Sequence, residues 1–398
     1  MVSRAAQIAD VAVIGGGMVG ATIGFNLALL GKDVVVLEAE NQIGFHSTGR
    51  SAAVFSETYG GCVVRALSRA SRQFFFEPPA GFVAHPLVTP RGELYVADSS
   101  TICRLDALAM EPDVAAVTRR LTAPETLALC PILKPDFVAS GLFEPDASDI
   151  DVDGLHQGYL RALRAVGGRL VLNAQIEELR RSGNHWDVET TQGRWQAEVV
   201  VNAAGAWAGQ IAELAGARRR GLQPCRRTAM LIEAPSEVTI HQWPFVIDAA
   251  ETFYFKPDAG AILLSPADET PSDPCDASAD EFDIAVAIDR FERATTMTVR
   301  RVRNRWAGLR TFVSDRAPLL GFDDQVPGFF WAAALGGYGI QTAPAVGELG
   351  AQLLVSGRFP EKFSNLSLTA EALAPGREGA SPAKAALRWA PSVNCETG

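Results

Sequence analysis

The sequence predicts an α/β protein organised around a Rossmann-like unit near its N-terminus. Residues 11–14 form a short apolar run of strand length, which leads directly into the glycine-rich turn Gly15–Gly20. An apolar segment of helical length, residues 21–30, follows this turn. Residues 33–37 then form a second, β-branched run, which ends on Glu38. Strand, turn, helix, strand and terminal acid occur in the order that a dinucleotide-binding βαβ unit requires.

Each glycine of the G-x-G-x-x-G pattern has its own predicted role. Gly15 permits the tight turn, Gly17 lets the backbone approach a pyrophosphate, and Gly20 lets the helix pack closely on the strand. The helix N-terminus favours phosphate, and Glu38 can accept hydrogen bonds from a ribose. Two other interpretations are a βαβ unit without a ligand and a membrane span, since residues 11–31 carry no charge. A strand-forming start and three consecutive glycines exclude the span.

Composition and charge narrow the function classes. The 398 residues are enough for two domains, and 47% hydrophobic with 21% charged residues is typical of a globular enzyme. A net charge of −10 argues against nucleic acid as a partner. The six cysteines and five histidines are dispersed, which predicts no metal site and favours a reducing compartment. Few residues precede the first strand, so we expect no signal peptide and a cytoplasmic protein, peripheral to the membrane if a quinone accepts its electrons.

Further segments resemble a known family over roughly residues 8–375. The chain resembles the D-amino-acid oxidase superfamily of flavoproteins, and within it the D-arginine dehydrogenase type of D-amino-acid dehydrogenase. The matching segments, in the family's order, are HSTGRSAA, PPAGF, HPLVTPRGEL, DIDVDGLHQGYLR, VNAAGAWA, GLQPCRRTA, FYFKPDAG, RWAGLRTF and ALGGYGIQT.

The resemblance implies a Rossmann-like FAD-binding domain interleaved with an α+β substrate domain built on an antiparallel sheet. The expected FAD-binding domain is discontinuous and comprises residues 1–84, 149–223 and 305–375. The expected substrate domain comprises residues 85–148 and 224–304. Residues 376–398 are rich in Ala, Gly, Pro and charge and are expected to form a loose tail.

The resemblance also implies which residues hold FAD. No cysteine lies near Arg310, so a cysteinyl link is not expected, and non-covalent FAD is favoured over attachment at His46. The glycines of the C-terminal turn let backbone N–H groups approach an anionic flavin edge. The expected cofactor-binding residues are Gly15, Gly17, Met18, Val19, Gly20, Glu38, Ala39, His46, Ser47, Thr48, Arg50, Ser51, Ala52, Ile176, Ala204, Gly205, Trp207, Arg310, Gly336, Gly337, Tyr338, Gly339, Ile340 and Gln341.

Flavin-dependent oxidation of an amino acid needs a clamp for the carboxylate, so that the Cα–H bond points at the flavin. Arginine is suited to this clamp because its planar fork binds a carboxylate bidentately. The family pattern implies Arg227, Arg310, Tyr59 and Tyr254 for this work, with Gly337 beside them. Alternatives are a domain-interface salt bridge for Arg310 and core positions for the tyrosines. Arg227 is ambiguous because Arg226 is adjacent and faces the other side of a strand.

Glu93 is the residue whose position predicts the charge of the substrate side chain. In arginine-preferring relatives a carboxylate at this position meets the guanidinium, so Glu93 implies a cationic substrate if it lies in the pocket; the alternative is an exposed strand glutamate. The chain departs from the family pattern at Val54, where a histidine is usual, and at Ser56, which replaces a threonine. We expect a more apolar pocket mouth and a preference shifted from arginine towards lysine or other D-amino acids.

An acidic run lies in the second half of the chain. Between Lys256 and Arg290 the chain has many acidic and no basic residues, together with three prolines. We expect a solvated loop, because charge runs usually face water. The alternative is an acidic rim that raises the local concentration of a cationic substrate.

The leading functional interpretation is FAD-dependent oxidation of D-amino acids, D-arginine-like or D-lysine-like or broader, to imino acids that hydrolyse to 2-oxo acids and ammonia. Oxidation of a secondary amine or small amino acid, such as sarcosine, glycine or D-proline, is the alternative. A non-enzymatic flavoprotein is a third, which the arginine pair disfavours. The expected partners are an amino acid substrate and an electron acceptor such as oxygen, a quinone or a dye, with no nucleic acid and no integral membrane segment.

Overall fold

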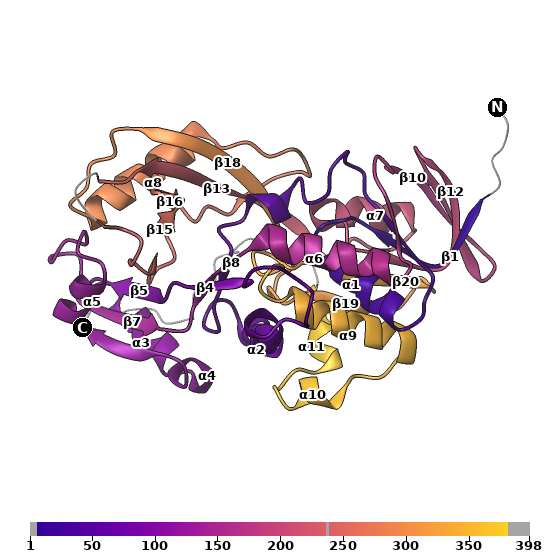
Figure 1. Ribbon diagram of the computed structural model, residues 1–398, viewed down its shortest axis with the longest axis horizontal. Helices are drawn as coiled ribbons and strands as arrows, with labels where there is room; N and C mark the ends of the chain where they lie inside the picture. Colours follow the sequence, from indigo (N-terminus) through magenta and orange to yellow (C-terminus); the bar gives the residue numbers. More distant parts are fainter. Residues whose placement is uncertain (1–5, 236–238, 381–398) are drawn as a thin grey trace.

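The computed structural model describes residues 6–235 and 239–380. Two main sheets lie side by side, with the N-terminal βαβ unit in one and the long strands β13 and β18 in the other (Figure 1). A small three-stranded sheet and α2 (Cys62–Phe76) lie between them. The mixed helix and strand content agrees with the predicted α/β class.

The first sheet contains the predicted dinucleotide-binding unit. Its central strands are parallel, and an antiparallel meander extends one edge. The path runs β10-β11-β12-β1-β2-β9, with β20 beside β12 and β19 beside β20. The strands are β1 (Gln7–Ile14), β2 (Val34–Leu37), β9 (Arg169–Val171), β10 (Ile176–Ser182), β11 (His185–Thr190), β12 (Gly193–Asn202), β19 (Leu319–Phe322) and β20 (Phe329–Ala333).

Both faces of this sheet are buried. Ala12 and Ile14 of β1 enter one apolar cluster, whereas Val11 and Val13 enter the cluster on the opposite face, as the two-residue period of a strand requires. This explains why the strand reads as a continuous apolar run. The covering helices include α1 (Met18–Leu29), α6 (Val152–Ala165), α7 (Ala208–Leu214) and α9 (Ala343–Ser356).

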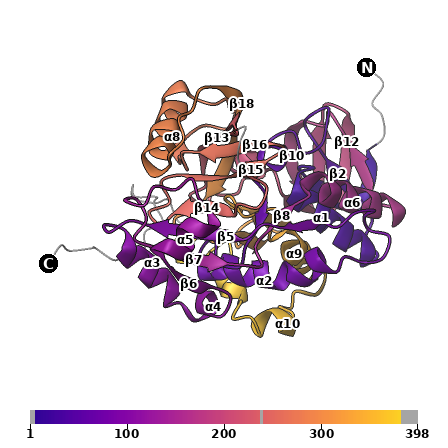
Figure 2. The same cartoon turned by 60° about the vertical axis from the view of Figure 1, so that its left-hand side comes forward.

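The second sheet is antiparallel except where β14 pairs with β5. Its path is β17-β13-β16-β15-β14-β5-β7-β6, with β18 beside β13. These strands are β5 (Glu93–Ala97), β6 (Arg119–Thr122), β7 (Ser140–Glu144), β13 (Gln223–Glu233), β14 (Phe245–Asp248), β15 (Tyr254–Asp258), β16 (Ala261–Ser265), β17 (Thr270–Pro271) and β18 (Val302–Phe312). The helices near it are α3 (Ile102–Ala109), α4 (Pro112–Ala115), α5 (Ala123–Leu129) and α8 (Glu281–Ala294). Figure 2 shows α8, β13 and β18 on one side and α1, β2 and β12 on the other.

Two features cross the expected domain limits. β18 spans the boundary placed at residue 305 and pairs with β13 over most of its length, so this whole strand belongs to the second sheet. The small sheet joins β3 (Val54–Phe55), β8 (Ser148–Ile150) and β4 (Val88–Pro90), which come from both expected domains. The chain therefore crosses from one main sheet to the other in the region that carries the site residues.

The C-terminal part is packed as far as the structure describes it. It forms α10 (Glu361–Ser364), α11 (Ala370–Leu373) and η3 (Glu378–Ala380). Arg377 binds Asp315 at 2.7 Å and Ala380 is buried, so residues 376–380 differ from the expected loose tail. Residues 381–398 of that expectation lie outside the described residues.

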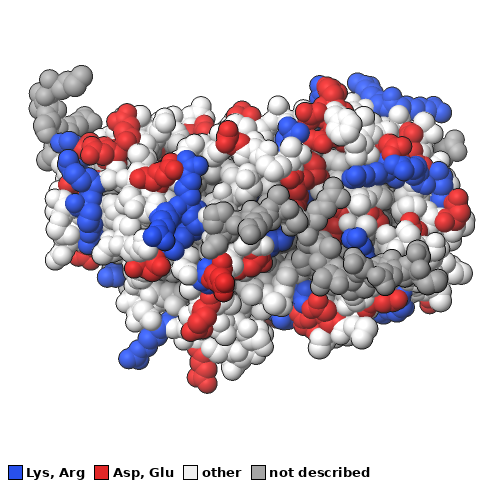
Figure 3. Space-filling model, turned by 180° about the vertical axis from the view of Figure 1, so that it is seen from behind, with Lys and Arg blue, Asp and Glu red and all other residues white. Residues whose placement is uncertain are grey.

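Acidic and basic side chains are interspersed over the face seen in Figure 3. Within residues 6–235 and 239–380, no helix is long and apolar enough to cross a membrane, and no group of three or more His, Cys, Asp and Glu side chains could hold a metal ion. Of the described cysteines, Cys62, Cys130, Cys225 and Cys275 are free, whereas Cys103 is disulfide-bonded. The cysteines therefore give no support to the expected reducing compartment.

Candidate active site

A small cavity of about 150 Å³ opens at the N-terminus of α1. Its wall combines this helix end, the 3-10 turn η1 (Ser47–Arg50), β18 and the C-terminal glycine turn. Fourteen of the expected cofactor-binding residues line it: Gly17, Met18, Val19, Ser47, Thr48, Arg50, Ser51, Ala52, Gly205, Arg310, Gly336, Gly337, Gly339 and Ile340. Segments far apart in the chain thus meet at this cavity, as the spacing of the motifs predicts.

The glycine turn has the shape that a bound pyrophosphate needs. A Cβ on Gly20 would lie 1.9 Å from the Gly15 carbonyl oxygen, so only glycine allows the helix to approach the turn this closely. α1 begins after Gly17 without a side-chain cap and without an acidic residue in its first turn. Thr48 Oγ1 accepts a hydrogen bond from the Met18 N–H at 3.1 Å. Apart from this contact no side chain caps the helix, so its end presents a positive dipole beside the cavity.

Two side chains fix the turn from behind. Glu38 accepts a hydrogen bond from the Gly16 N–H at 2.7 Å. It directly follows β2, at the position where a carboxylate is expected to bind the ribose of the dinucleotide. The His156 Nε2 lies 2.9 Å from the Gly16 carbonyl oxygen. Burial lowers the pKa of His156, so the ring is neutral and its Nε2–H donates to the carbonyl. His156 was not predicted as a site residue, although it lies within the quoted segment DIDVDGLHQGYLR.

The other expected cofactor residues lie outside the wall of the small cavity. Gly15, Gly20 and Glu38 shape the turn, and Tyr338 and Gln341 lie in the C-terminal turn. The remaining members are Ala39, His46, Ile176, Ala204 and Trp207, which do not line this cavity. Ala39 and Ala204 follow β2 and β12, His46 directly precedes η1, Trp207 ends the 3-10 turn η2 (Gly205–Trp207), and Ile176 begins β10.

Arg50 lines the small cavity and also forms hydrogen bonds to other parts of the protein. It donates to the Ala307 carbonyl oxygen at 3.0 Å and to Asp276 Oδ1 at 2.5 Å. Asp276 belongs to the acidic run, so Arg50 joins the η1 turn to that run. His46 contacts Glu40 through Nε2 at 2.9 Å, and its ring lies 4.4 Å from that of Trp207.

A second, larger cavity of about 1030 Å³ adjoins the small one. The two cavities share Ser51, Ala52, Arg227, Tyr254, Arg310, Gly337 and Ile340. The expected catalytic residues Tyr59, Glu93, Arg227, Tyr254, Arg310 and Gly337 all line the larger cavity. The structure therefore brings these residues together, from the loop after β3 and from β5, β13, β15, β18 and the C-terminal turn.

Arg310 stands at the boundary of the two cavities. Its Nη1 donates to the Tyr59 hydroxyl at 3.1 Å, and a Cβ on Gly337 would lie 2.5 Å from Nη1. Among the described residues, no carboxylate forms an ion pair with Arg310. A domain-interface salt bridge is therefore not its role, and the guanidinium can accept an anion from the cavity.

Arg227, in contrast, already has anionic partners. It donates to the Asp268 carbonyl oxygen at 2.7 Å and to Glu269 Oε1 at 3.1 Å. Arg316, which sequence reasoning did not single out, binds both oxygens of Glu269 at 2.7 and 2.9 Å. Arg227 is thus held within an Arg–Glu–Arg network, and of the expected pair Arg310 is the one without an acidic partner in the described structure.

The two tyrosines face the arginines. The Tyr59 ring packs edge-on against Tyr338, with centroids 5.1 Å apart. Arg227 lies 5.9 Å from the centroid of the Tyr254 ring. Burial acts to raise the pKa of Tyr254, but Arg310 and Arg227 outweigh it and lower this pKa below its ordinary value. Both hydroxyls therefore belong to a positive region of the cavity rather than to an apolar core.

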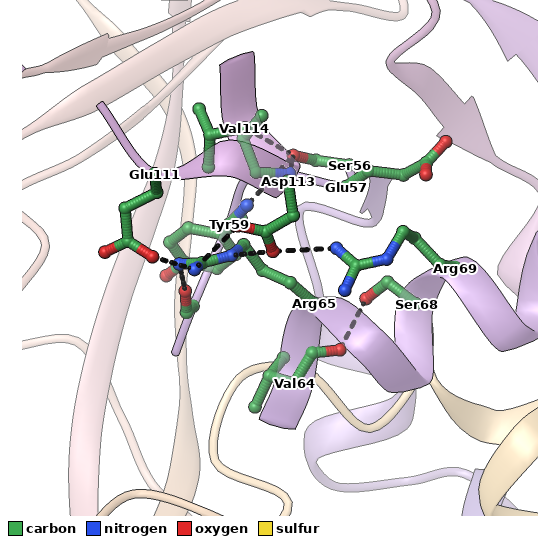
Figure 4. Close-up of polar contacts among 12 residues, drawn as sticks. Ser56, Glu57, Tyr59, Val64, Arg65, Ser68, Arg69, Glu111, Asp113 and Val114 are labelled. Carbon is green, nitrogen blue, oxygen red and sulfur yellow. Dashed lines mark hydrogen bonds and ion pairs between the residues drawn. The ribbon is translucent and has the colours of Figure 1, made fainter. Parts of the chain in front are cut away.

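Arg65 anchors the loop that carries Tyr59, as Figure 4 shows. This arginine lies on α2, is 1% exposed, and donates to the Gly60 carbonyl oxygen at 2.9 Å. On its other side it forms ion pairs with Asp113 and Glu111 near α4. Because a buried guanidinium without these partners is costly, the cluster fixes the loop against the substrate side of the molecule.

Glu93 lies on the cavity wall but is buried against a second carboxyl group. Ser56 and Thr58 contact both Glu93 and Glu144 at 2.8–3.0 Å. Burial and the neighbouring Glu144 raise the pKa of Glu93 to about 8. Glu93 is therefore not the exposed strand glutamate of the alternative interpretation, and it is largely protonated near pH 7.

Three acidic residues of the run, Asp268, Glu269 and Asp283, line the cavity wall, whereas Asp273, Asp276, Asp280 and Glu281 are exposed, as expected for a solvated loop. Asp268 accepts a hydrogen bond from the Thr228 N–H at 2.6 Å, and Asp283 binds Arg226 at 2.8 Å. The composition of the run could not reveal these partners, because Thr228 and Arg226 both lie on β13, far from the run in the sequence. Glu251 was also missed. It lines the cavity, forms no hydrogen bond or ion pair to described residues through its carboxyl group, and burial raises its pKa to about 7.

Comparisons with known proteins agree with this geometry. Residues 10–353 match the family model described as FAD dependent oxidoreductase (DAO). Human mitochondrial dimethylglycine dehydrogenase is 28% identical over 268 residues, covering 65% of this chain and 30% of that protein. Glycine oxidase of Geobacillus kaustophilus (strain HTA426) is 25% identical over 382 residues, covering 90% of this chain and 96% of that protein.

The fold is also shared with a solved structure. L-proline dehydrogenase from P. horikoshii superimposes with a TM-score of 0.78 at 22% identity, covering 89% of this chain and 95% of that one. The chain spans less than half the length of the mammalian dimethylglycine dehydrogenases that it matches. Because the family model covers most of the chain and the glycine cradle fits a dinucleotide, the chain belongs to the FAD dependent oxidoreductase family (DAO), with FAD as its cofactor.

Proposed function

We propose that this chain oxidises the amine of an α-amino carboxylate, with the substrate carboxylate bound by Arg310. The observation that carries the proposal is the position of Arg310. Its guanidinium lies where the FAD-side cavity meets the larger cavity, and no carboxylate of the described residues forms an ion pair with it. The residue is half-buried and its planar fork binds carboxylates bidentately, so a substrate carboxylate is a fitting partner.

The residues around Arg310 hold and orient the substrate. Tyr59 accepts from Nη1, which fixes the plane of the guanidinium, and Gly337 leaves the space into which the arginine packs. A carboxylate held in this plane limits the directions in which the substrate Cα–H bond can point. Bound FAD supplies the acceptor for a hydride equivalent from that carbon. The resulting imino acid then hydrolyses in water to a 2-oxo acid and an amine or ammonia.

The favoured substrates carry an uncharged side group on the α-carbon or nitrogen. A protonated Glu93 offers a cationic side chain no counter-charge near pH 7, so the cationic D-arginine or D-lysine type is less well supported. The names of two relatives, dimethylglycine dehydrogenase and glycine oxidase, favour small amino acids and N-methylated amino acids. The larger cavity, about 1030 Å³, has room for more than glycine, so D-leucine and D-proline belong in the tested panel.

The test is anaerobic bleaching of FAD by a substrate panel. It contains glycine, N-methylglycine, D-proline, D-leucine and D-arginine, each added to the purified holoenzyme at pH 7. We expect bleaching by one or more uncharged members and weaker bleaching by D-arginine. The cationic alternative predicts that D-arginine bleaches fastest. Retained yellow colour with every member of the panel would contradict the proposed function.

A further inference from the structure

Two carboxyl groups face each other across neighbouring strands, and one of them, Glu93, lines the larger cavity. Glu93 of β5 and Glu144 of β7 are direct partners in the antiparallel register, and each is 1% exposed. Like charges directly opposite in a sheet repel each other, and burial removes the water that would screen them. The structure can keep this pair only if at least one of the two groups is neutral.

The hydrogen bonds of the pair require an additional proton. Four oxygen atoms, Ser56 Oγ, Thr58 Oγ1, Glu93 Oε1 and Glu144 Oε2, make five mutual contacts of 2.8–3.1 Å. The two hydroxyls supply one proton each. A proton on one carboxyl group adds a third donor. A doubly ionised pair would leave Glu93 Oε1 and Glu144 Oε2 dependent on the same two hydroxyl protons.

No neighbouring cation balances the pair. Neither carboxyl group forms an ion pair with any residue in the described ranges. Arg72 of α2 is engaged by Glu57 at 2.6 Å, and Lys256 of β15 by Asp149 at 2.6 Å. Arg91, two residues before Glu93, also binds Asp149.

The remaining titratable neighbours add negative charge or a hydroxyl. Glu57 raises the pKa of Glu144, although its N–H donates to Glu144 Oε1 at 2.9 Å. Tyr95 of β5 lowers the pKa of Glu93 slightly through its hydroxyl, against the larger effects of burial and Glu144. Glu251 lines the same cavity. Protonation is therefore the remaining way to neutralise the pair.

We propose that Glu144 determines substrate specificity by acting through Glu93, because the two carboxyl groups share one proton and keep this part of the cavity wall uncharged at neutral pH. The inference rests on the proposed function, and it names the substrate class of that site. Glu93 Oε2 is buried without a hydrogen-bond partner in the described structure. A neutral substrate leaves the shared proton in place. A cationic side chain gains an ion pair with Glu93 only when the proton leaves to the solvent.

The inference is tested with two carboxylic acids that lack an α-amine and therefore cannot be oxidised at that position. 5-Guanidinopentanoate carries a cation at its far end, and hexanoate carries none. Binding to the holoenzyme is followed by the FAD absorption spectrum. Proton release is measured by titration calorimetry at pH 7 in two buffers of different ionisation enthalpy. Both ligands place a carboxylate at Arg310 near Glu251, so hexanoate serves as the baseline for proton exchange. We expect close to one proton more released per bound 5-guanidinopentanoate than per bound hexanoate. The ratio of the affinity for 5-guanidinopentanoate to the affinity for hexanoate should rise up to tenfold per pH unit until about pH 8.

The Glu144→Gln variant separates a charge effect from a structural effect. It removes the opposing carboxyl group while keeping the side-chain shape, so Glu93 should ionise at lower pH. We expect at least tenfold tighter binding of 5-guanidinopentanoate at pH 7, less proton release, and hexanoate affinity within about twofold of wild type. Glu213→Gln, an exposed acid on α7 paired with Arg219, controls for the loss of one charge and should change neither ligand.

The outcomes distinguish this inference from the function on which it rests. Binding of the cationic ligand by wild type with no more proton release than hexanoate would overturn the shared proton, whatever the variant does. An equal effect of Glu144→Gln on both ligands would overturn the role of Glu144 in specificity. In either case the bleaching of FAD by amino acids can still succeed, so the proposed function survives. Failure of both ligands to bind would contradict the Arg310 clamp and overturn both.

Discussion

The Arg310 Nη1 donates a hydrogen bond to the Tyr59 hydroxyl at 3.1 Å, at the boundary between the FAD-side cavity and the larger cavity. The two residues come from β18 and from the loop after β3. Their contact connects the second sheet to the loop that Arg65 anchors. Through Ser56, the same loop also contacts the Glu93–Glu144 pair. The loop after β3 thus connects the proposed carboxylate clamp, Arg310, to the Glu93–Glu144 pair that is proposed to determine substrate specificity.

Replacing Arg310 should impair both turnover and affinity. Arg310→Met removes a charge-assisted pair with the substrate carboxylate, which is worth roughly 1.5–3 kcal/mol. It also removes the orientation of the Cα–H bond, so kcat should fall together with kcat/KM. Arg305→Met on the same strand is the matched control, because Arg305 is exposed and pairs with Glu281. The test is to measure kcat and kcat/KM of both variants with FAD bound. Unchanged values for Arg310→Met would show that Arg310 does not bind the substrate.

Gly337 should tolerate no side chain. The Cβ of Gly337→Ala would lie 2.5 Å from Arg310 Nη1 and 2.6 Å from its Cζ, so the guanidinium must move. We expect a loss of kcat/KM of about tenfold or more with FAD retained, which stopped-flow reduction would show. Gly61→Ala is the control, because a Cβ there meets nothing within 4 Å. Equal activity of the two alanine variants would mean that Arg310 need not hold this position.

Glu251 should impose a pH dependence on anion binding. Its pKa is raised to about 7 by burial, against the lowering effect of Arg227, Arg316 and Arg310. Above pH 7 it becomes negative and opposes a carboxylate at Arg310, so hexanoate affinity should fall between pH 6 and pH 8. In Glu251→Gln this step near pH 7 should disappear. Spectral titrations of FAD across this range measure the effect. A step that persists in the variant would assign it to another group.

The Glu93–Glu144 pair should make the protein less stable as the pH rises. An unfolded glutamate titrates near 4.5, whereas the folded Glu93 titrates near 8. The folded state thus keeps a proton that the unfolded state loses between these values. Stability from this site is fully present below about pH 4.5 and is lost as the pH rises to about 8. The slope is about 1.4 kcal/mol per pH unit for each proton retained.

Denaturant unfolding of the holoenzyme at pH 5, 6, 7 and 8 checks this slope. Glu144→Gln should flatten the decline, because Glu93 then has no opposing carboxyl group. Glu213→Gln should follow the wild type. If the free energy of unfolding declines equally with pH in wild type and Glu144→Gln, the pair ionises without destabilising the folded state.

FAD should be released by acid precipitation. His46 lies outside the wall of the small cavity, and its Nε2 contacts Glu40 at 2.9 Å. A covalent bond at His46 is therefore not expected. After acid treatment the yellow colour should appear in the supernatant, with His46→Ala giving the same result as wild type. Colour that stays with the precipitated wild type and is lost in the variant would instead identify His46 as an attachment site.

The sequence predicted best what depends on short segments. The G-x-G-x-x-G turn, its helix and Glu38 are contiguous, so periodicity and glycine spacing describe them directly. Family resemblance then located Arg310 and Tyr59, which the structure brings within hydrogen-bond distance. The resemblance named the residues, but only the fold could show that Arg227 is already paired with Glu269 while Arg310 has no acidic partner among the described residues.

What could not be predicted depends on register and on distant partners. Glu93 and Glu144 meet only because β5 and β7 pair with one particular offset, and a single-residue shift would separate them. Composition could not predict which acidic residues of the run reach the cavity, because the cationic partners of the run, Arg50 and Arg226, lie far away in the sequence. Glu251 carries no motif at all. Its place follows from a turn in which it adopts a φ of 53°, unusual for glutamate.

The most direct test compares two amines that differ only in the carboxylate. N-Methylglycine and dimethylamine share the N-methyl amine, and D-alanine and ethylamine form a second pair. Each is mixed anaerobically with the holoenzyme, and the rate of FAD bleaching is recorded for wild type and Arg310→Met. We expect that wild type is reduced by at least one carboxylate-bearing amine and at least a hundredfold more slowly by the matching amine without a carboxylate. We expect Arg310→Met to lose most of this difference. Equal rates for both members of every pair, or a difference that survives in Arg310→Met, would contradict it.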